Sequence, residues 1–161
     1  DVQLFHATVR DNLTFFNTAI QDEQIMQAIS ELGLQSWFST LPTGLETQLG
    51  PGGTGLSGGE AQLLAMTRVL LRQPSLIILD EASARLDPAT ERLLDTAITR
   101  LLHKRTAIII AHRLATIERA DTLLILDHGQ VVEQGAYAQL ANDPHSHFYA
   151  LLQSGVTAVL A

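Results

Sequence analysis

Cysteine is absent from this sequence of 161 residues. Its absence excludes disulfides, thiolate metal sites and cysteine nucleophiles, and it fits a reducing compartment. Lysine is almost absent too, since Lys104 is the only lysine among ten basic residues, and the formal net charge is -7. A surface that tracks the phosphates of nucleic acid needs clustered positive charge, so nucleic acid is not expected as a partner.

Long apolar runs are missing as well. The longest, at 76–79 and 107–111, have the length of a strand and are far too short for a membrane span. The sequence therefore predicts no transmembrane segment in this chain. Apolar residues still make up 46% of the sequence, which is enough to build a core. The chain opens on Asp1 without methionine or an apolar leader, which predicts that residue 1 lies inside a longer protein.

A phosphate loop of the form G-x-x-x-x-G-K-[ST] is also absent, because no glycine lies near Lys104. A different glycine-rich stretch, GPGGTG at 50–55, leads into an apolar helix expected at about 57–71. Ser57 and Glu60 have the spacing of a capping box, in which each residue bonds an exposed amide of the helix start. The bare glycines between them, Gly58 and Gly59, would also let an anion approach these amides. The two interpretations are compatible.

Helical spacing dominates the first part of the chain, including DNLTFF at 11–16 and the run at 22–34, where Gly33 is a plausible helix stop. Beyond residue 73, short apolar strands alternate with helices. Strands are expected at 76–79, 107–111 and 123–126, helices from Asp87-Pro88 and at 114–119, and a closing hairpin around 127–129. This alternation favours an α/β fold with a mainly parallel sheet, whose functional groups gather at the carboxyl ends of the strands.

Asp80, Glu81 and His112 directly follow two of these expected strands. Adjacent carboxylates after a buried strand can hold a magnesium ion with one and a water molecule with the other, although an acidic loop is an equally simple interpretation. A lone histidine is more often packed or exposed than catalytic, but His112 can reach the same phosphate if its strand lies beside that of Asp80. His145 and His147 lie in a polar loop and are interpreted as surface residues.

Four ordered segments, DVQLFHATVRDNL, GLSGGEAQ, LIILDEASARLD and IIIAHRLATI, resemble the nucleotide-binding domain of exporter-type ABC transporters. The resemblance extends from Asp1 to about Gln153. It implies the α/β fold of a P-loop NTPase (an ABC ATPase), here incomplete. It also implies a helical signature subdomain at 1–73, a catalytic α/β part at 74–142 with Walker B, D-loop and switch histidine, and a C-terminal helix and tail at 143–161.

The resemblance implies ATP and Mg2+ as cofactors and assigns roles to matching residues. Asp80 would coordinate magnesium, Glu81 would polarise the attacking water, and His112 would contact the terminal phosphate. The signature motif would close over nucleotide held by a second nucleotide-binding domain in a head-to-tail dimer. The positions implied to bind nucleotide are Leu56, Ser57, Gly58, Gly59 and Glu60 of the signature and Asp87 of the D-loop. The transmembrane domain of the transporter is the other implied partner, which implies a location at the cytoplasmic face of the membrane.

Some features of the family are missing from this sequence. Walker A and the Q-loop glutamine would both precede Asp1 in the family pattern, so Gln3 is not that glutamine. Glu60 stands where the family usually has glutamine, which places a carboxylate near a phosphate. Two functions stay open: an ATPase domain that powers export, and a truncated, catalytically silent piece that serves at most as an interaction module. A soluble ABC ATPase of translation or DNA repair is disfavoured by the RDNL and AHRLATI segments.

Overall fold

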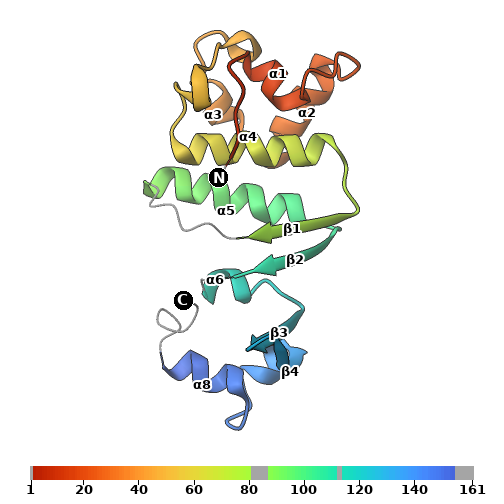
Figure 1. Ribbon diagram of the computed structural model, residues 1–161, viewed down its shortest axis with the longest axis vertical. Helices are drawn as coiled ribbons and strands as arrows, with labels where there is room; N and C mark the ends of the chain where they lie inside the picture. Colours follow the sequence, from red (N-terminus) through yellow and green to blue (C-terminus); the bar gives the residue numbers. More distant parts are fainter. Residues whose placement is uncertain (1, 81–86, 112–113, 155–161) are drawn as a thin grey trace. The chain divides into compact units, whose positions relative to one another are not determined.

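The computed structural model describes residues 2–80, 87–111 and 114–154 (Figure 1). Their contacts divide the chain into two compact units. Unit 1 comprises Asp1–Ile78 and Ala84–Ile108, and unit 2 comprises Leu79–Ser83 and Ile109–Ala161, as far as these residues are described. None of the helices in the described ranges is both long enough and apolar enough to cross a membrane.

Unit 1 is built around helix α4 (Gly58–Leu71), which contacts α1 (Val9–Thr14), α2 (Asp22–Leu32) and α5 (Pro88–Leu102). In Figure 1, α4 lies between α5 on one side and the α1–α2 layer on the other. A helix packed on several sides needs apolar residues around most of its circumference, and α4 has them. The buried apolar side chains of these four helices are Val9, Leu13, Ile25, Ala28, Ile29, Leu32, Leu63, Leu64, Leu70, Leu94, Ala97 and Leu101.

Local signals in the sequence explain where these helices begin and end. Thr8 caps α1 by accepting a hydrogen bond from Asp11 N, and Asp87 caps α5. Gly33 ends α2 in the left-handed region with φ 74°, as its sequence position predicts. Between α2 and α4, the chain forms α3 (Gln35–Phe38) and two short 3-10 helices, η1 (Gly44–Glu46) and η2 (Pro51–Gly53).

The predicted helical spacing of DNLTFF fails at its last two residues. Helix α1 ends at Thr14, and both Phe15 and Phe16 adopt left-handed backbone conformations, with φ 54° and 61°. Such angles are uncommon for any residue other than glycine. The two aromatic rings therefore leave the helix and are 41% and 54% exposed.

Strands β1 (Leu76–Asp80) and β2 (Thr106–Ile110) form a two-stranded sheet, and their arrows run in the same direction in Figure 1. Side chains alternate between the two faces of a strand, so the two faces have different surroundings. On one face Ile77 is buried. On the other face four aliphatic side chains, between 47% and 64% exposed, lie open: Leu76, Ile78, Ile108 and Ile110.

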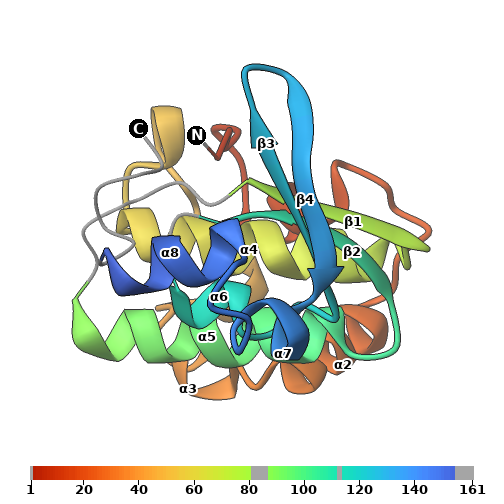
Figure 2. The ribbon, with the colours of Figure 1, turned by 90° about the horizontal axis from the view of Figure 1, so that it is seen from below.

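Unit 2 contains the antiparallel hairpin of β3 (Thr122–Asp127) and β4 (Gln130–Ala136), drawn as two long neighbouring arrows in Figure 2, with α6 (Leu114–Ile117), α7 (Tyr137–Leu140) and α8 (His147–Gln153). His128 and Gly129 both have positive φ, which fits the tight hairpin turn predicted there. Glu133 of β4 ties down α8, because its carboxylate accepts hydrogen bonds from His147 N and Phe148 N at 3.1 and 2.9 Å.

The predicted order of helices and strands matches the described elements, but the predicted sheet is only partly present. The described strands form two separate two-stranded sheets, β1–β2 and β3–β4, and the second is antiparallel. Among the described strands, β2 and β3 do not pair with each other. A single, mainly parallel sheet therefore stays a prediction, and what the structure shows is a mixed α/β chain with small sheets.

The exposed face of β1 and β2 predicts that the isolated chain associates nonspecifically, since open apolar strands invite edge and face contacts. We expect the double variant Ile78→Thr, Ile108→Thr to stay monodisperse at concentrations where the unmodified chain scatters light. Threonine keeps the β-branched shape that favours a strand while removing apolar surface. Dynamic light scattering over a concentration series measures this.

The matched control is Ile77→Thr, on the buried face of the same strand. It places a hydroxyl among apolar atoms and should lower the free energy of unfolding by about 2 kcal/mol without improving solubility. An unmodified chain that remains a monodisperse monomer with cooperative unfolding would contradict the expectation.

Candidate nucleotide site

The glycine-rich turn before α4 positions the first residues of that helix. Gly53 has φ 83°, and a Cβ at this position would collide with the side chain of Leu4, so only glycine fits. The amide of Leu56 donates to Gly53 O at 3.1 Å, which closes the turn directly before Ser57. This turn brings an exposed serine to the N-cap position, directly before the first residue of the helix.

The predicted capping box is present. Ser57 Oγ accepts a hydrogen bond from Glu60 N at 3.2 Å, and the Glu60 carboxylate accepts one from Ser57 N at 2.8 Å. Ser57 is the N-cap of α4, with φ -67° and ψ 162°. Two of the amides at the helix start are therefore occupied, and the hydroxyl proton of Ser57 is still available to a ligand.

The remaining amides of the helix start belong to the two glycines. Within the described residues, no hydrogen-bond acceptor is found for Gly58 N or Gly59 N. A Cβ built on Gly58 would meet no atom within 4 Å, so the space beside this residue is open. Two amides without an acceptor among the described residues, at the positive end of a helix, form an arrangement that attracts an anion, and of the two glycines Gly58 is exposed and Gly59 is buried.

The other predicted site residues divide between the two units. Asp80 is the last residue of β1 and is exposed, as expected for a carboxylate at a strand end. Glu81 and His112 lie outside the described residues. Leu56 is half-buried and Asp87 is exposed at the start of α5. Three or more ligating side chains that together could hold a metal are not found within the described ranges.

Asp87 has a structural role whatever its role in nucleotide binding. Its carboxylate accepts hydrogen bonds from Ala89 N at 3.1 Å and Thr90 N at 3.0 Å. Hydrogen bonds from the side chain and the backbone amide of Thr90 lower the pKa of Asp87 below its ordinary value of 3.8. The ionised carboxylate thus stabilises the start of α5.

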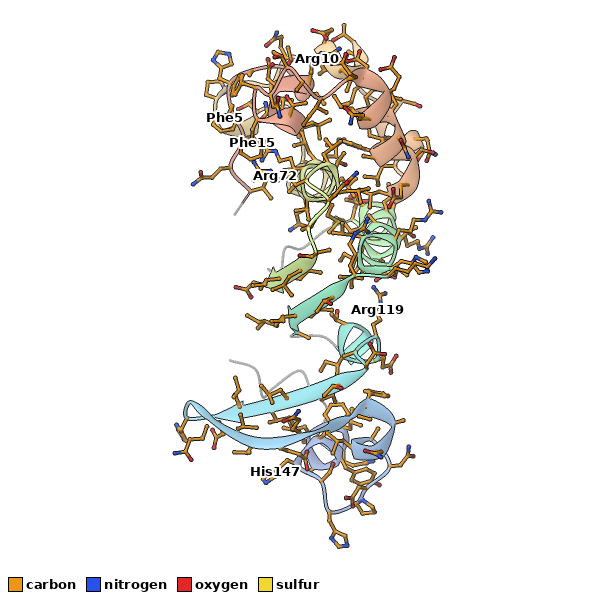
Figure 3. The ribbon with its side chains drawn as sticks, turned by 90° about the vertical axis from the view of Figure 1, so that its right-hand side faces the viewer. Phe5, Arg10, Phe15, Arg72, Arg119 and His147 are labelled. Atoms are coloured by element: carbon orange, nitrogen blue, oxygen red, sulfur yellow. The ribbon has the colours of Figure 1, made fainter. Side chains whose placement is uncertain are left out.

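Sequence reasoning did not predict a second feature of unit 1, the aromatic patch, which we define as Phe5, Phe15 and Phe16 with Arg72. Phe5 makes edge contacts with both other rings, at centroid distances of 5.7 and 5.4 Å. The Arg72 guanidinium lies 4.5 Å from the centroid of the Phe15 ring. Figure 3 shows Phe5, Phe15 and Arg72 close together. The adjacent phenylalanines were the available signal, but their left-handed backbone is not readable from the sequence.

Beneath the aromatic patch, the buried Arg68 of α4 joins three segments of the chain. Its guanidinium donates to Asn12 O at 2.6 Å, Asn12 Oδ1 at 2.8 Å and Gln3 O at 2.7 Å, and it lies 4.8 Å from the centroid of the Phe15 ring. Asn12 is fully buried and bonds Phe5 N and Phe5 O. Burial lowers the pKa of Arg68.

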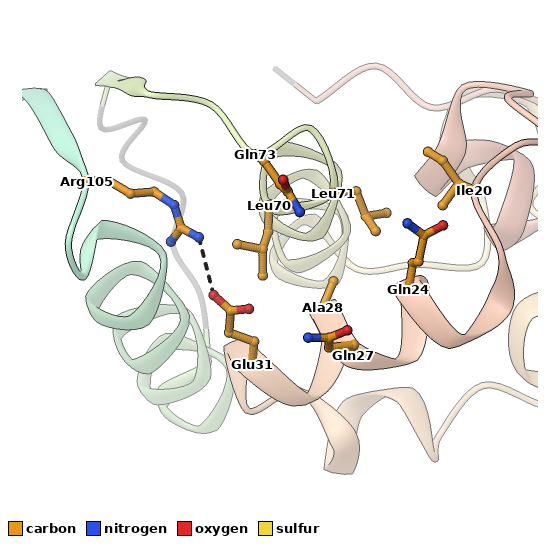
Figure 4. Close-up of a pocket in the computed structure, with 9 residues that line it drawn as sticks. All are labelled: Ile20, Gln24, Gln27, Ala28, Glu31, Leu70, Leu71, Gln73 and Arg105. Atoms are coloured by element: carbon orange, nitrogen blue, oxygen red, sulfur yellow. Dashed lines mark hydrogen bonds and ion pairs between the residues drawn. The ribbon is translucent and has the colours of Figure 1, made fainter.

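Unit 1 also contains an open pocket of about 310 Å³ between α2 and the end of α4 (Figure 4). Its polar wall includes the ion pair of Arg105 and Glu31, with a nitrogen–oxygen distance of 3.3 Å. The pocket is lined by Ile20, Gln24, Gln27, Ala28, Glu31, Leu70, Leu71, Gln73 and Arg105. None of these residues belongs to the predicted site.

Replacing Arg68 should destabilise unit 1. Lysine at this position cannot reproduce the three hydrogen bonds of the planar guanidinium, so Arg68→Lys is expected to lower the free energy of unfolding by about 3 kcal/mol. Arg72→Lys is the matched control: Arg72 is exposed and stacks on the same ring, and its loss should cost less than about 1 kcal/mol. Urea unfolding followed by the fluorescence of Trp37, the only tryptophan, measures both. Equal costs for the two variants would contradict the central role of the Arg68 network.

The lowered pKa of Asp87 predicts a pH dependence with a defined sign. The unfolded state binds the proton more readily, so the contribution of the cap is complete above the ordinary pKa of 3.8 and is lost as the pH falls through the lower folded-state pKa. We expect the unmodified chain to be more stable than Asp87→Asn at pH 6, and we expect this difference in stability to shrink toward pH 2. The urea concentrations at the midpoint of unfolding, measured for both proteins across this pH range, test the expectation. An advantage that is independent of pH would show that the charge of Asp87 is not involved.

Comparison with known proteins identifies relatives of this sequence. A sequence model described as "ABC transporter" matches residues 1–84. The ATP-dependent lipid A-core flippase of Neisseria meningitidis is 37% identical over 154 residues, which are 96% of this chain and 24% of that protein. The flippase of Pseudomonas fluorescens is 41% identical over 93% of this chain and 26% of its own length.

Relatives are not restricted to lipid A flippases. The beta-(1-->2)glucan export ATP-binding/permease protein NdvA of Bartonella bacilliformis is 39% identical over 96% of this chain and 26% of its own length. ABC transporter B family member 21 of Arabidopsis thaliana is 33% identical over 93% of this chain and 12% of its own length. The chain thus spans about a quarter or less of the length of each of these relatives. The match to residues 1–84 and the similarity over most of the chain show that it belongs to the ABC transporter family, within the ATPase domain and with exporter-type homologues.

Proposed function

We propose that this chain supplies the signature motif and the Walker B carboxylates of an ATPase that powers export across a membrane. The observation that carries the proposal is the start of α4, where Gly58 N and Gly59 N have no acceptor within the described residues and the space beside Gly58 is open. Two amides, a serine hydroxyl and the positive end of a helix form a donor set that fits a phosphate. Family membership supports ATP as the ligand.

The residues of the chain would act by positioning and by stabilising charge. Bound MgATP supplies the transferable phosphoryl group and a metal charge on its oxygens. Gly58 N, Gly59 N and the Ser57 hydroxyl would donate hydrogen bonds to the terminal phosphate of a nucleotide held by a second nucleotide-binding domain. Asp80, exposed at the end of β1, offers its carboxylate to the metal. Glu81 and His112, outside the described residues, are proposed to polarise the attacking water and to contact the terminal phosphate.

The signature motif is proposed to act on nucleotide held by a second nucleotide-binding domain. The G-x-x-x-x-G-K-[ST] loop that grips the β- and γ-phosphates is not among these 161 residues, whereas the exposed start of α4 offers donors to a phosphate. In the head-to-tail pair that the family resemblance implies, the start of α4 in one domain would face the phosphate loop of the other.

A membrane domain is the second proposed partner. One relative is named as a flippase and another as an export permease, which supports export as the process that ATP hydrolysis drives. The aromatic patch supports such a contact, because it exposes apolar rings and a guanidinium that has no carboxylate partner among the described residues. It would fit a membrane-domain segment that presents apolar and acidic side chains. The chain would then work at the cytoplasmic face of the membrane.

A catalytically silent interaction module is the alternative function. For this chain taken alone, the absence of a phosphate loop from its 161 residues favours the silent module, whereas the intact capping box and the open space beside Gly58 favour a working signature site. The two functions differ in whether this chain responds to nucleotide on another domain.

Gly58→Ala separates the two functions. The added methyl group meets no atom within 4 Å in the free chain, and alanine is the better helix former, so stability should be unchanged or raised by up to about 1 kcal/mol. The same methyl group would occupy the approach of a phosphate to the helix start. We expect the unmodified chain to be inactive alone and to stimulate ATP hydrolysis by an added intact ABC nucleotide-binding domain, and we expect Gly58→Ala to lose that stimulation.

The assay is phosphate release by the added domain, titrated with each form of the chain. Circular dichroism melting of Gly58→Ala verifies that the variant is folded. Stimulation that survives Gly58→Ala would remove the start of α4 from the site. No stimulation by the unmodified chain would favour the silent module.

A further inference from the structure

One residue of the proposed site carries a charge that a phosphate-binding helix start does not require. The Glu60 carboxylate is held at the N-terminus of α4 by Ser57 N, at 2.8 Å. Glu60 follows Gly59 directly and Gly58 by two positions, so it is close to the two amides of the proposed site. A phosphate bonded to Gly58 N and Gly59 N would therefore lie near a second negative charge.

The charge is not needed for the capping box, and the chain itself shows this. Helix α2 begins with a capping box in which Gln21 N donates to the neutral side chain of Gln24 at 2.9 Å. Glutamine at position 60 would accept the same bond from Ser57 N with its amide oxygen. The geometry of the helix start is thus available without the negative charge.

The charge of Glu60 is also not compensated by a cation. Within the described residues no arginine, lysine or histidine forms an ion pair with Glu60. The only basic residue of α4 besides its C-cap Arg72 is Arg68, which lies at the other end of the helix and is bonded to Asn12 and Gln3. Among the described residues, a phosphate at the helix start thus meets a carboxylate that no cation compensates.

We propose that Glu60 weakens the hold of the signature site on nucleotide phosphate, so that the complex with the nucleotide-bearing domain opens readily. This inference rests on the function proposed above. Repulsion between a carboxylate and a doubly charged phosphate about 6 Å apart, even at the dielectric constant of water, corresponds to roughly a tenfold loss of affinity. The charge of Glu60 thereby favours release of the nucleotide-bearing domain over the tightest binding.

The experiment compares unmodified chain with Glu60→Gln. Each is mixed with an intact ABC nucleotide-binding domain whose hydrolysis is disabled, at saturating MgATP, and the dissociation constant of the complex is measured by analytical ultracentrifugation. We expect Glu60→Gln to lower this constant about tenfold in low salt. Salt screens exposed charges, so the difference should shrink to about threefold or less at 0.5 M salt.

Two controls distinguish this electrostatic effect from a structural one. Glu23→Gln removes an exposed carboxylate from the first turn of α2, in the same unit, and should leave the dissociation constant unchanged. Unfolding monitored through Trp37 should show Glu60→Gln to be equally or slightly less stable, since a carboxylate is favourable at a helix start. A gain in affinity without a gain in stability identifies the phosphate site as the origin.

The outcomes separate the two proposals. Equal dissociation constants for unmodified chain and Glu60→Gln, or a gain that salt does not reduce, would overturn the inference and leave the proposed function in place. Weaker association of Glu60→Gln would also overturn it, because the charge would then assist binding. The absence of nucleotide-dependent association for both proteins would overturn the inference together with the proposed function.

Discussion

A single buried guanidinium holds the parts of unit 1 together. Arg68 reaches from α4 to Asn12 and Gln3, and Asn12 in turn bonds the backbone of Phe5. Removing a charged group from water costs free energy, which these hydrogen bonds and the contact with Phe15 offset. Because Asn12 is fully buried, neither partner can turn to solvent without breaking the network. The network therefore fixes the segment before α1 against the far end of α4.

Helix α4 connects two surfaces of different chemistry. Its start presents amides, a hydroxyl and a carboxylate, whereas its end supports aromatic rings and guanidinium groups. At 14 residues the helix is about 21 Å long, and its packing against α1, α2 and α5 keeps it rigid. A displacement imposed at one end is thus transmitted to the other as a movement of the whole helix.

Much of the fold could be predicted because its signals are local. The capping box of Ser57 and Glu60, the cap of Asp87 and the stop at Gly33 each depend on residues within one helical turn. Strand pairing is a different matter, since nothing local in the run at 107–111 or in the run at 123–126 says which strand lies beside it. The Arg68 network joins residues 56 and 65 positions apart, and no local pattern indicates it.

The part of the candidate site that depends on local sequence signals, the helix start at Ser57, was also predicted. The structure confirms that Ser57, Gly58 and Gly59 lie at a helix start, and their role in nucleotide binding stays a prediction. Glu81 and His112, which are predicted to act with Asp80, lie outside the described ranges. The aromatic patch escaped prediction because Phe15 and Phe16 leave their helix with backbone angles that their side chains disfavour.

The reach of Arg68 has a consequence for the order in which the chain folds. The hydrogen bond from Arg68 to Gln3 closes a loop of 65 residues, whereas the hydrogen bond from Phe148 N to Glu133 in unit 2 closes a loop of 15 residues. Closing a longer loop costs more chain entropy, and contacts distant in sequence form more slowly. During synthesis from the N-terminus, the segment around Asn12 must remain without its partner until α4 has left the ribosome. The β3–β4 hairpin and α8 have no such delay, because they are close in sequence and are made almost together.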